Sequence, residues 1–391
     1  MRRLFAIAMA LALLAFSVAP AAAATDPHIT VNDKDATAAL AAVVESNELM
    51  APVDALAKAI GAQLTVSADG REYTLSATGY SIVFEEGKTA AIVNGAVRQA
   101  PVAPHKSGDK LMVPVRFVAQ GLGTYNTLDA ATGNLSIMTG RYLVEKTNKA
   151  GSVNQKMVAK MLMAMKLSGA DLPGGTMNMT IDMDMNAHLN NQNMLMTMKT
   201  GDMDVMGVKV PGMTMTMAMK ENKLYMKSNQ AGDKWQVLPT AAKIDPKEML
   251  SSPQFKDLSP EKLQGELLDS STITISGTET VNNVQAVKVN MYMSDKGFEK
   301  LMNDVFDSLL KAEGAKGGVA MPEMKVKISN MSASYLIDPA TGFAYQSNME
   351  MRLSISMKMD GETADIDMGL KMNTQSTPTD EAITWPADLP K

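Results

Sequence analysis

The second half of the chain alternates apolar and polar residues with a period of two. From Met177 to Met185 the odd positions are Met or Ile, and the even positions are Asn, Thr and Asp. Successive side chains of a β-strand point to opposite faces, so this pattern predicts strands with methionines on one face and polar side chains on the other. We expect a large antiparallel sheet with one apolar face and one face in water. The alternation recurs in segments 194–198, 213–219, 291–293, 349–359 and 366–372.

A different spacing precedes the first of these strands. Val153, Met157, Met161 and Met165 recur every four residues, which predicts an amphipathic helix that opens the methionine-rich region. Other segments have helical patterns between the strands, and the glycine-rich segment 314–322 is predicted to be a linker rather than a lid. We therefore expect a curved antiparallel sheet, or half-barrel, with helices covering its apolar face. The further helices are predicted at 245–255, 260–270 and 294–314.

The first half of the chain contains an internal repeat. Residues 49–77 align with residues 111–139 at a constant offset, so that Pro52 matches Pro114 and Gly61 matches Gly123. Each copy predicts a strand end, a helix begun by proline and ended by glycine, and then a β-hairpin. Asn94-Gly95, between β-type residues, predicts another hairpin between the copies. The expected fold class is α+β, with a small repeat-built domain before the sheet.

Three motifs of this region carry a family resemblance: Val93-Asn94-Gly95, "LMVPVRFVAQGLG" at 111–123 and "GNLSIMTG" at 133–140. Residues 27–140 resemble the copper amine oxidase N-terminal-like domain of secreted bacterial proteins. The resemblance implies an extracytoplasmic accessory or cell-wall-facing module. It does not imply an oxidase, since such an enzyme needs three copper-binding histidines and an Asn-Tyr-Asp/Glu motif. The only histidines here are His28, His105 and His188, and no Asn-Tyr dipeptide occurs.

The N-terminus has the features of a secretory signal peptide. Arg2 and Arg3 precede an apolar stretch over 4–18, and small residues follow at 22–24. We predict cleavage after Ala24, export, and no transmembrane segment in the mature chain.

Composition sets the domain boundaries and excludes several functions. Of 36 methionines, 31 lie from Arg141 onward, so we predict domains at 1–24 (signal peptide), 25–140 and 141–391. No cysteine is present, which excludes disulfides, thiolate metal sites and a thiol nucleophile. The net charge of −5 is unsuited to binding nucleic acid.

The order of elements from Glu145 to about Trp385 carries a second resemblance. After the opening strands come "DKWQVLP" at 233–239, a helical insertion, and "ASYLIDPATGFAYQSNMEM" at 333–351. This order resembles the exported lipoprotein-carrier-like proteins of the LolA/LppX type. The resemblance implies a curved, incomplete β-barrel whose helices plug an apolar cavity.

The methionine face has three interpretations. It is a core, or it lines a cavity for an apolar or lipid-like ligand, for which flexible methionine is well suited. The third is a Cu(I) site of thioether ligands, with Met213, Met215, Met217 and His188 as candidates. The predicted cavity lining is Met179, Met183, Met196, Met198, Met215, Met217, Met291, Met351 and Met357.

No catalytic motif is recognisable. The chain lacks Gly-x-Ser-x-Gly and His-Glu-x-x-His, and the aspartate pairs at 182/184, 202/204 and 365/367 fit solvated strand faces. We expect a secreted, non-catalytic binding protein of the cell envelope that needs no cofactor. Its expected partner is an apolar or lipid-like ligand or a cell-wall component. The alternatives are a Cu(I)-binding envelope protein and a purely structural cell-wall-associated protein.

Overall fold

The computed structural model describes residues 27–149, 155–169, 176–190, 193–205, 208–221, 223–237, 260–293, 323–359 and 362–390. The chain divides into two compact units, one up to Met138 and one from Thr139. The predicted signal peptide, the helices at 245–255 and 294–314 and the linker at 314–322 lie outside the described residues. No helix among the described residues is long and apolar enough to cross a membrane.

The first unit contains the same strand–helix–hairpin order twice. The first copy is β4 (Glu48–Pro52), α3 (Val53–Ile60), β5 (Gln63–Val66) and β6 (Glu72–Ala77). The second is β11 (Lys110–Pro114), α4 (Val115–Gly121), β12 (Tyr125–Leu128) and β13 (Leu135–Met138). β4 and β11 pair antiparallel, with Met50 opposite Pro114 and Pro52 opposite Met112. The copies therefore meet through equivalent residues.

The remaining elements complete three small sheets, with strand orders β12-β13-β1-β2, β10-β11-β4-β3 and β5-β6-β7-β8-β9. Leu56, Leu75, Ile82, Val113 and Ile137 are fully buried in their common core. The added elements are β1 (Ile29–Val31), β2 (Lys34–Asp35), α2 (Thr37–Leu40), β3 (Val43–Glu45), β7 (Tyr80–Glu85), β8 (Ala90–Val93), β9 (Ala96–Gln99) and β10 (His105–Ser107).

The hairpin predicted at Asn94-Gly95 is confirmed between β8 and β9. Both residues have positive φ, 52° and 81°, as a two-residue type I′ turn requires. The Asn94 side chain accepts a hydrogen bond from the Ser81 N–H at 2.8 Å and donates one to the Gly121 carbonyl at 3.1 Å. One turn residue thus links β7, the hairpin and α4.

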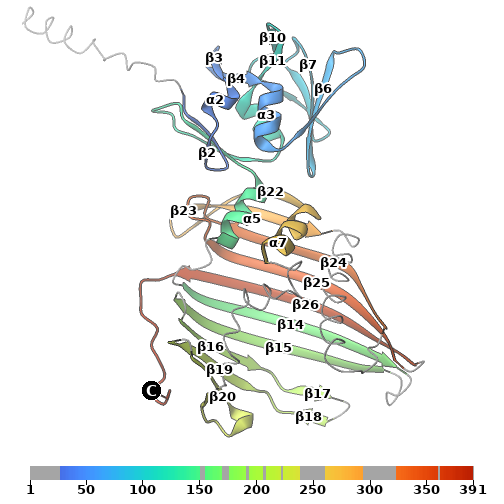
Figure 1. Ribbon diagram of the computed structural model, residues 1–391, viewed down its shortest axis with the longest axis vertical. Helices are drawn as coiled ribbons and strands as arrows, with labels where there is room; N and C mark the ends of the chain where they lie inside the picture. Colours follow the sequence, from blue (N-terminus) through green and yellow to red (C-terminus); the bar gives the residue numbers. More distant parts are fainter. Residues whose placement is uncertain are drawn as a thin grey trace, which may run out of the picture. The chain divides into compact units, whose positions relative to one another are not determined.

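The second unit is built on one 11-stranded sheet, with order β21-β20-β19-β16-β15-β14-β26-β25-β24-β23-β22. Every neighbouring pair is antiparallel. The sheet is curved as a half-barrel (Figure 1). Its strands are β14 (Gln155–Gly169), β15 (Thr176–Asn190), β16 (Asn193–Thr200), β19 (Thr214–Lys220), β20 (Lys223–Ser228), β21 (Gln236–Val237), β22 (Ser271–Val281), β23 (Val284–Met293), β24 (Glu323–Ile337), β25 (Ala344–Met359) and β26 (Glu362–Pro378).

Five smaller elements complete the described part of this unit. β17 (Met203–Val205) and β18 (Val208–Val210) form a separate two-stranded sheet, and η1 (Asn229–Ala231) follows β20. The helix predicted at 260–270 is confirmed as α7 (Pro260–Asp269). A helix not predicted from the sequence, α5 (Gly140–Lys149), opens the unit.

The helix predicted from Val153 to Met165 is wrong, because its described part, residues 155–165, lies in strand β14. A spacing of four residues is two strand periods as well as about one helical turn. Neighbouring segments decide whether such a pattern forms a helix or a strand. Here β14 pairs along its length with the strands β15 and β26. Val158 and Leu162, which a helix would have buried beside the methionines, are 50% and 43% exposed.

The helices α5 and α7 lie against β22 and β23 at one end of the sheet. A Cβ atom at Gly140 would lie 3.0 Å from Ile273 Cγ2, so the absent side chain permits close packing. Leu143, Val144 and Leu268 are buried there. Arg141 joins the two helices, because it contacts Glu145 at 2.9 Å and Asp269 at 2.5 Å. At this end, α5 occupies the face of the sheet that carries Ile273.

Candidate binding face of the large sheet

Strand register brings methionines of many strands to one face of the large sheet. Met183, Met161, Met372, Met349, Ala333, Met291 and Ile273 are consecutive cross-strand partners from β15 to β22. The adjacent row on the same face is Ile181, Met163, Leu370, Met351, Met331, Met293 and Ser271. Directly opposite residues have Cβ atoms about 4.5–5.5 Å apart, so these side chains form a continuous surface.

The same face continues beyond β15. Met185, Met198 and Met215 are consecutive partners on β15, β16 and β19. The next row is Ala187, Met196, Met217 and Met226. The segment "PGMTMTMAMK" therefore places its alternate methionines on one face of the sheet. That face is apolar from β20 to β23. We call this surface the methionine face.

Burial changes along the methionine face. Near α5, Met291 and Met293 are 3% and 1% exposed and belong to a packed core. Farther along, the side chains of Met183, Met196, Met198, Met215, Met217 and Met351 are only half-buried. Seven of the nine residues predicted as lining thus have described side chains, and register places them on one face. Met179 and Met357 stand opposite Met165 and Met324 in the strand register.

His188, the one histidine among the alternative copper ligands, lies apart from the methionines. His188 pairs with Lys156 and Leu195, at positions that alternate with the methionines of β15 and β16, so it lies on the opposite face. Met213 precedes β19, where its N–H donates to Thr200 Oγ1 at 2.9 Å. Among the residues that the structure describes, no group of three or more His, Asp or Glu could hold a metal ion.

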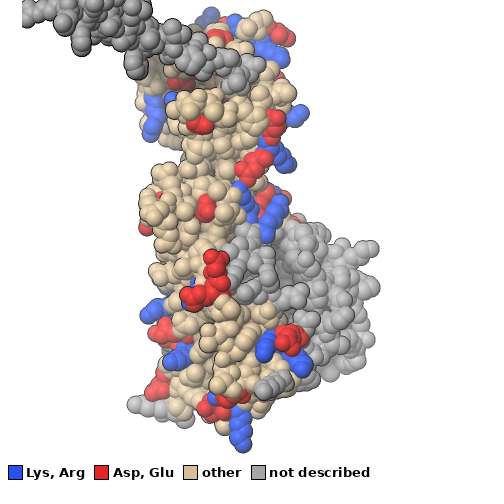
Figure 2. Space-filling view, turned by 90° about the vertical axis from the view of Figure 1, so that its left-hand side faces the viewer, with Lys and Arg blue, Asp and Glu red and all other residues tan. Residues whose placement is uncertain are grey.

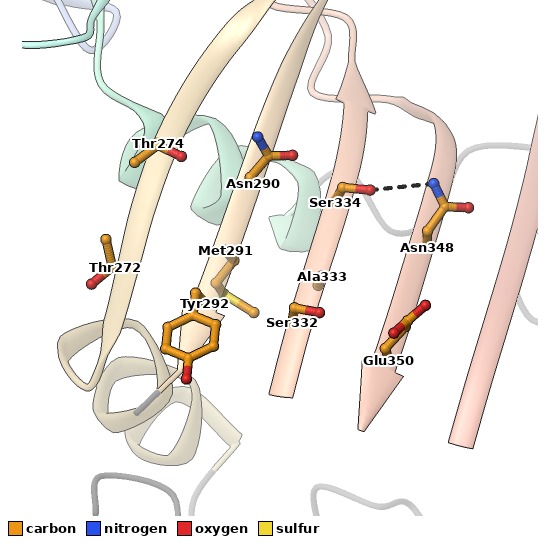
Figure 3. A pocket seen from close by; sticks show the side chains of 10 residues that line it. All are labelled: Thr272, Thr274, Asn290, Met291, Tyr292, Ser332, Ala333, Ser334, Asn348 and Glu350. Carbon is orange, nitrogen blue, oxygen red and sulfur yellow. Dashed lines mark hydrogen bonds between the residues drawn. The ribbon is translucent and has the colours of Figure 1, made fainter. Parts of the chain in front are cut away.

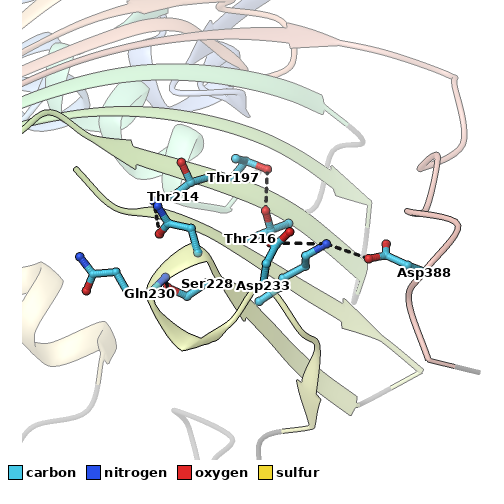
Figure 4. Close-up of polar contacts among 9 residues, drawn as sticks. Thr197, Thr214, Thr216, Ser228, Gln230, Asp233 and Asp388 are labelled. Atoms are coloured by element: carbon cyan, nitrogen blue, oxygen red, sulfur yellow. Dashed lines mark hydrogen bonds and ion pairs between the residues drawn. The ribbon is translucent and has the colours of Figure 1, made fainter. Parts of the chain in front are cut away.

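The opposite face is polar and carries the predicted aspartates. Asp182, Asp184, Asp365 and Asp367 are exposed on β15 and β26. Thr197 and Thr216 lie opposite each other, with their hydroxyl oxygens 3.4 Å apart (Figure 4). Figure 2, which views the molecule from the left-hand side of Figure 1, shows basic and acidic residues interspersed on that side. The exposed aspartates of β15 and β26 make the polar face of the sheet suited to water.

A C-terminal strap, defined as residues 379–390, crosses the polar face. Glu381 accepts a hydrogen bond from Lys156 of β14 at 2.7 Å. Asp388 accepts one from Lys227 of β20 at 2.8 Å (Figure 4). Between them, Lys220 Nζ of β19 lies 5.7 Å from the centre of the Trp385 ring. The strap therefore spans the strands from β14 to β20.

The strap contacts lower two carboxyl pKa values. The hydrogen bond from Lys156 is the main cause of the lowered pKa of Glu381, and the charge of His188 adds to it. The hydrogen bond from Lys227 is the main cause of the lowered pKa of Asp388. The sequence does not predict the strap, since isolated Glu, Trp and Asp residues after the last strand give no local signal of what they contact.

A comparison with family models agrees with the first resemblance. Residues 30–137 match the family model described as "Copper amine oxidase N-terminal domain". Comparison with curated proteins gave no match.

Solved structures similar to this chain include the lipoprotein LppX of Mycobacterium tuberculosis (11% identity, 63% of this chain, 97% of that chain, TM-score 0.27). LprF of Mycobacterium bovis is also similar (15% identity, 64% and 96%, TM-score 0.25). A third is a LolA superfamily protein of Nitrosomonas europaea (10% identity, 60% and 93%, TM-score 0.16). At these TM-scores no residue role is carried over from them. Residues 30–137 thus match the copper amine oxidase N-terminal domain, and LppX and a LolA superfamily protein are among the structures that resemble the chain.

Proposed function

We propose that this protein is a non-catalytic binding protein of the cell envelope that holds an apolar or lipid-like ligand on the methionine face. One observation carries the proposal: half-buried methionines form a contiguous surface from β25 to β20. The predicted signal peptide supports an extracytoplasmic location, and the absence of recognisable catalytic motifs supports a non-catalytic role.

The choice of side chain favours a ligand over a core alone. A core that specifies one structure is best built from Leu, Ile and Val, because methionine has more rotamers and specifies packing poorly. A surface that accepts apolar molecules of variable shape gains from that flexibility. Burying a fully exposed methionine contributes about 1.5–3 kcal/mol, and covering a half-buried one contributes part of that, so a ligand must cover several of them to bind well.

Native mass spectrometry of the purified protein tests the proposal. The probes are a bacterial extract of phosphatidylethanolamine and phosphatidylglycerol, and separately Cu(I) under anaerobic conditions. We expect an added mass of lipid size that is lost on denaturation. Copper increments without lipid would replace the proposal with thioether metal binding. If neither mass is added, the methionine face is a core and the proposal fails.

A pair of isosteric variants tests where the lipid binds. Met351→Gln and Met196→Gln place an amide on the methionine face, where a bound apolar chain would leave it without a hydrogen-bond partner. That costs about 1–3 kcal/mol, so we expect at least fivefold weaker lipid binding. Leu162→Gln, at a 43% exposed site on the polar face, is the matched control and should bind lipid as the unmodified protein does. Equal losses in all three variants would contradict the assignment to this face.

A further inference from the structure

A hollow of about 380 Å³ lies on the polar face, over β22 to β25 (Figure 3). It forms because β24 contributes short side chains, Ser332 and Ser334, between the larger ones of its neighbours. Asn290 and Tyr292 of β23 stand on one side, with Asn348 and Glu350 of β25 on the other. The hollow is therefore a trough that follows β24, on the opposite face from the row of Met349, Met291 and Ile273.

Two ladder rows supply the lining. Thr272, Tyr292, Ser332 and Glu350 are consecutive partners, as are Thr274, Asn290, Ser334 and Asn348. Hydroxyl and carboxamide groups both donate and accept hydrogen bonds. Asn348 already donates to Ser334 Oγ at 3.2 Å, and the Glu350 charge is balanced by Lys371 Nζ at 3.0 Å. The trough thus offers many neutral donors and acceptors.

Tyr292 adds an aromatic surface to this polar lining. Its cross-strand partners, Thr272 and Ser332, have short side chains that leave the ring standing above them. Tyr292 is 49% exposed, which is unusual for a large aromatic side chain. An exposed ring beside hydroxyl and amide groups suits a molecule with an apolar C–H face and polar edges.

Other ligand classes fit the trough less well. No Lys or Arg is among the lining residues that the structure describes, so the trough itself presents no positive charge there to hold an anion. An apolar ligand would leave the hydroxyls and amides buried without partners, which is unfavourable. A peptide that adds a strand needs a free sheet edge, whereas β23 and β24 are paired on both sides.

We propose that this trough binds a neutral oligosaccharide chain, with one sugar ring stacked on Tyr292 and its hydroxyls bonded to the Asn, Ser and Thr ladder. Sugar hydroxyls need both donors and acceptors, and pyranose rings present a C–H face to aromatic rings. A neighbouring hollow shares Ser334 and Asn348 and continues past Gln346, where Lys288 and Glu279 add one positive and one negative charge. From Glu350 to Gln346 the strand advances about 13 Å, which is room for more than one sugar unit.

Isothermal titration calorimetry of the whole protein tests this site. The probes are cellotetraose, maltotetraose and chitotetraose, with trigalacturonate as an anionic comparison. We expect at least one neutral tetrasaccharide to bind, and Tyr292→Ala to weaken that binding about tenfold, because the variant loses both the stacking and the apolar contact of the ring. Asn348→Ala should weaken it severalfold.

Controls separate recognition from folding. Tyr292→Phe keeps the ring and should bind within about threefold of the unmodified protein. Val158→Ala, at a 50% exposed site on the polar face outside the trough, should leave binding unchanged. The proposal is overturned if no neutral tetrasaccharide binds at millimolar concentration, if only trigalacturonate binds, or if Tyr292→Ala binds normally. The lipid experiment probes the other face, so either proposal can fail without the other.

Discussion

Gly61 and Gly123 occupy the same position in the two repeats of the first unit, directly after α3 and near the end of α4. Both have left-handed backbone conformations, with φ of 72° and 67°. Their surroundings differ. A Cβ atom on Gly61 would meet nothing within 4 Å, whereas one on Gly123 would lie 2.1 Å from Cζ of Tyr80. The sequence repeat predicted both helix ends, but only the packed structure distinguishes the two glycines.

Alanine substitutions should therefore have unequal effects. We expect Gly61→Ala to cost about 1–2 kcal/mol for the left-handed backbone alone. Gly123→Ala should cost about 1–3 kcal/mol more, because the Tyr80 ring must move. Hydrogen exchange of amides in residues 43–138 measures the loss of stability in each variant. Adding Tyr80→Ala to the Gly123→Ala variant should remove most of the difference in cost, and equal effects of the two single changes would refute this account.

At the scale of elements, the polar face is organised by a segment without regular structure. The C-terminal strap is fastened to β14, β19 and β20 by Glu381, Trp385 and Asp388. Its ionic contacts involve carboxylates with lowered pKa values. A carboxyl group whose pKa is lower in the folded protein stabilises its contact at pH values above its ordinary pKa. This stabilisation is lost as the pH falls through the lowered pKa.

We expect the strap to stay bound at neutral pH. It should detach as the pH falls below the ordinary pKa of Asp and Glu side chains, which is about 4. Hydrogen exchange of peptides covering residues 379–390, measured at several pH values, follows this release. Lys227→Ala should increase exchange at neutral pH because it removes the partner of Asp388. Lys199→Ala, an exposed lysine of β16, serves as control. A strap that exchanges equally fast at all pH values would rule out this role for the ion pairs.

The whole molecule has two units with separate hydrophobic cores. In the first, Leu75 is fully buried with Ile82 and Val113, and in the second, Leu143 is fully buried on α5. Both tryptophans, Trp235 and Trp385, belong to the second unit. Tryptophan fluorescence therefore reports on only one of the two units.

Leu75→Ala should destabilise the first unit by about 2–5 kcal/mol, the usual cost of such a cavity. In urea, we expect the far-ultraviolet circular dichroism transition to shift and broaden while the tryptophan fluorescence transition stays in place. Leu143→Ala is the matched change in the second unit and should shift the fluorescence transition. If Leu75→Ala moves the fluorescence midpoint as far as Leu143→Ala does, the two units unfold as one.

The sequence alone determined what depends on local chemistry. Alternation of Met with Thr, Asn and Asp defined the strands of the large sheet, and Asn94-Gly95 defined a turn, because side-chain direction and turn geometry are set by near neighbours. Tertiary structure decided what depends on distant partners. It made 155–169 a strand, since β15 and β26 flank it, and put His188 on the face opposite the methionines. It also brought the strap across the polar face and formed the trough beside Tyr292.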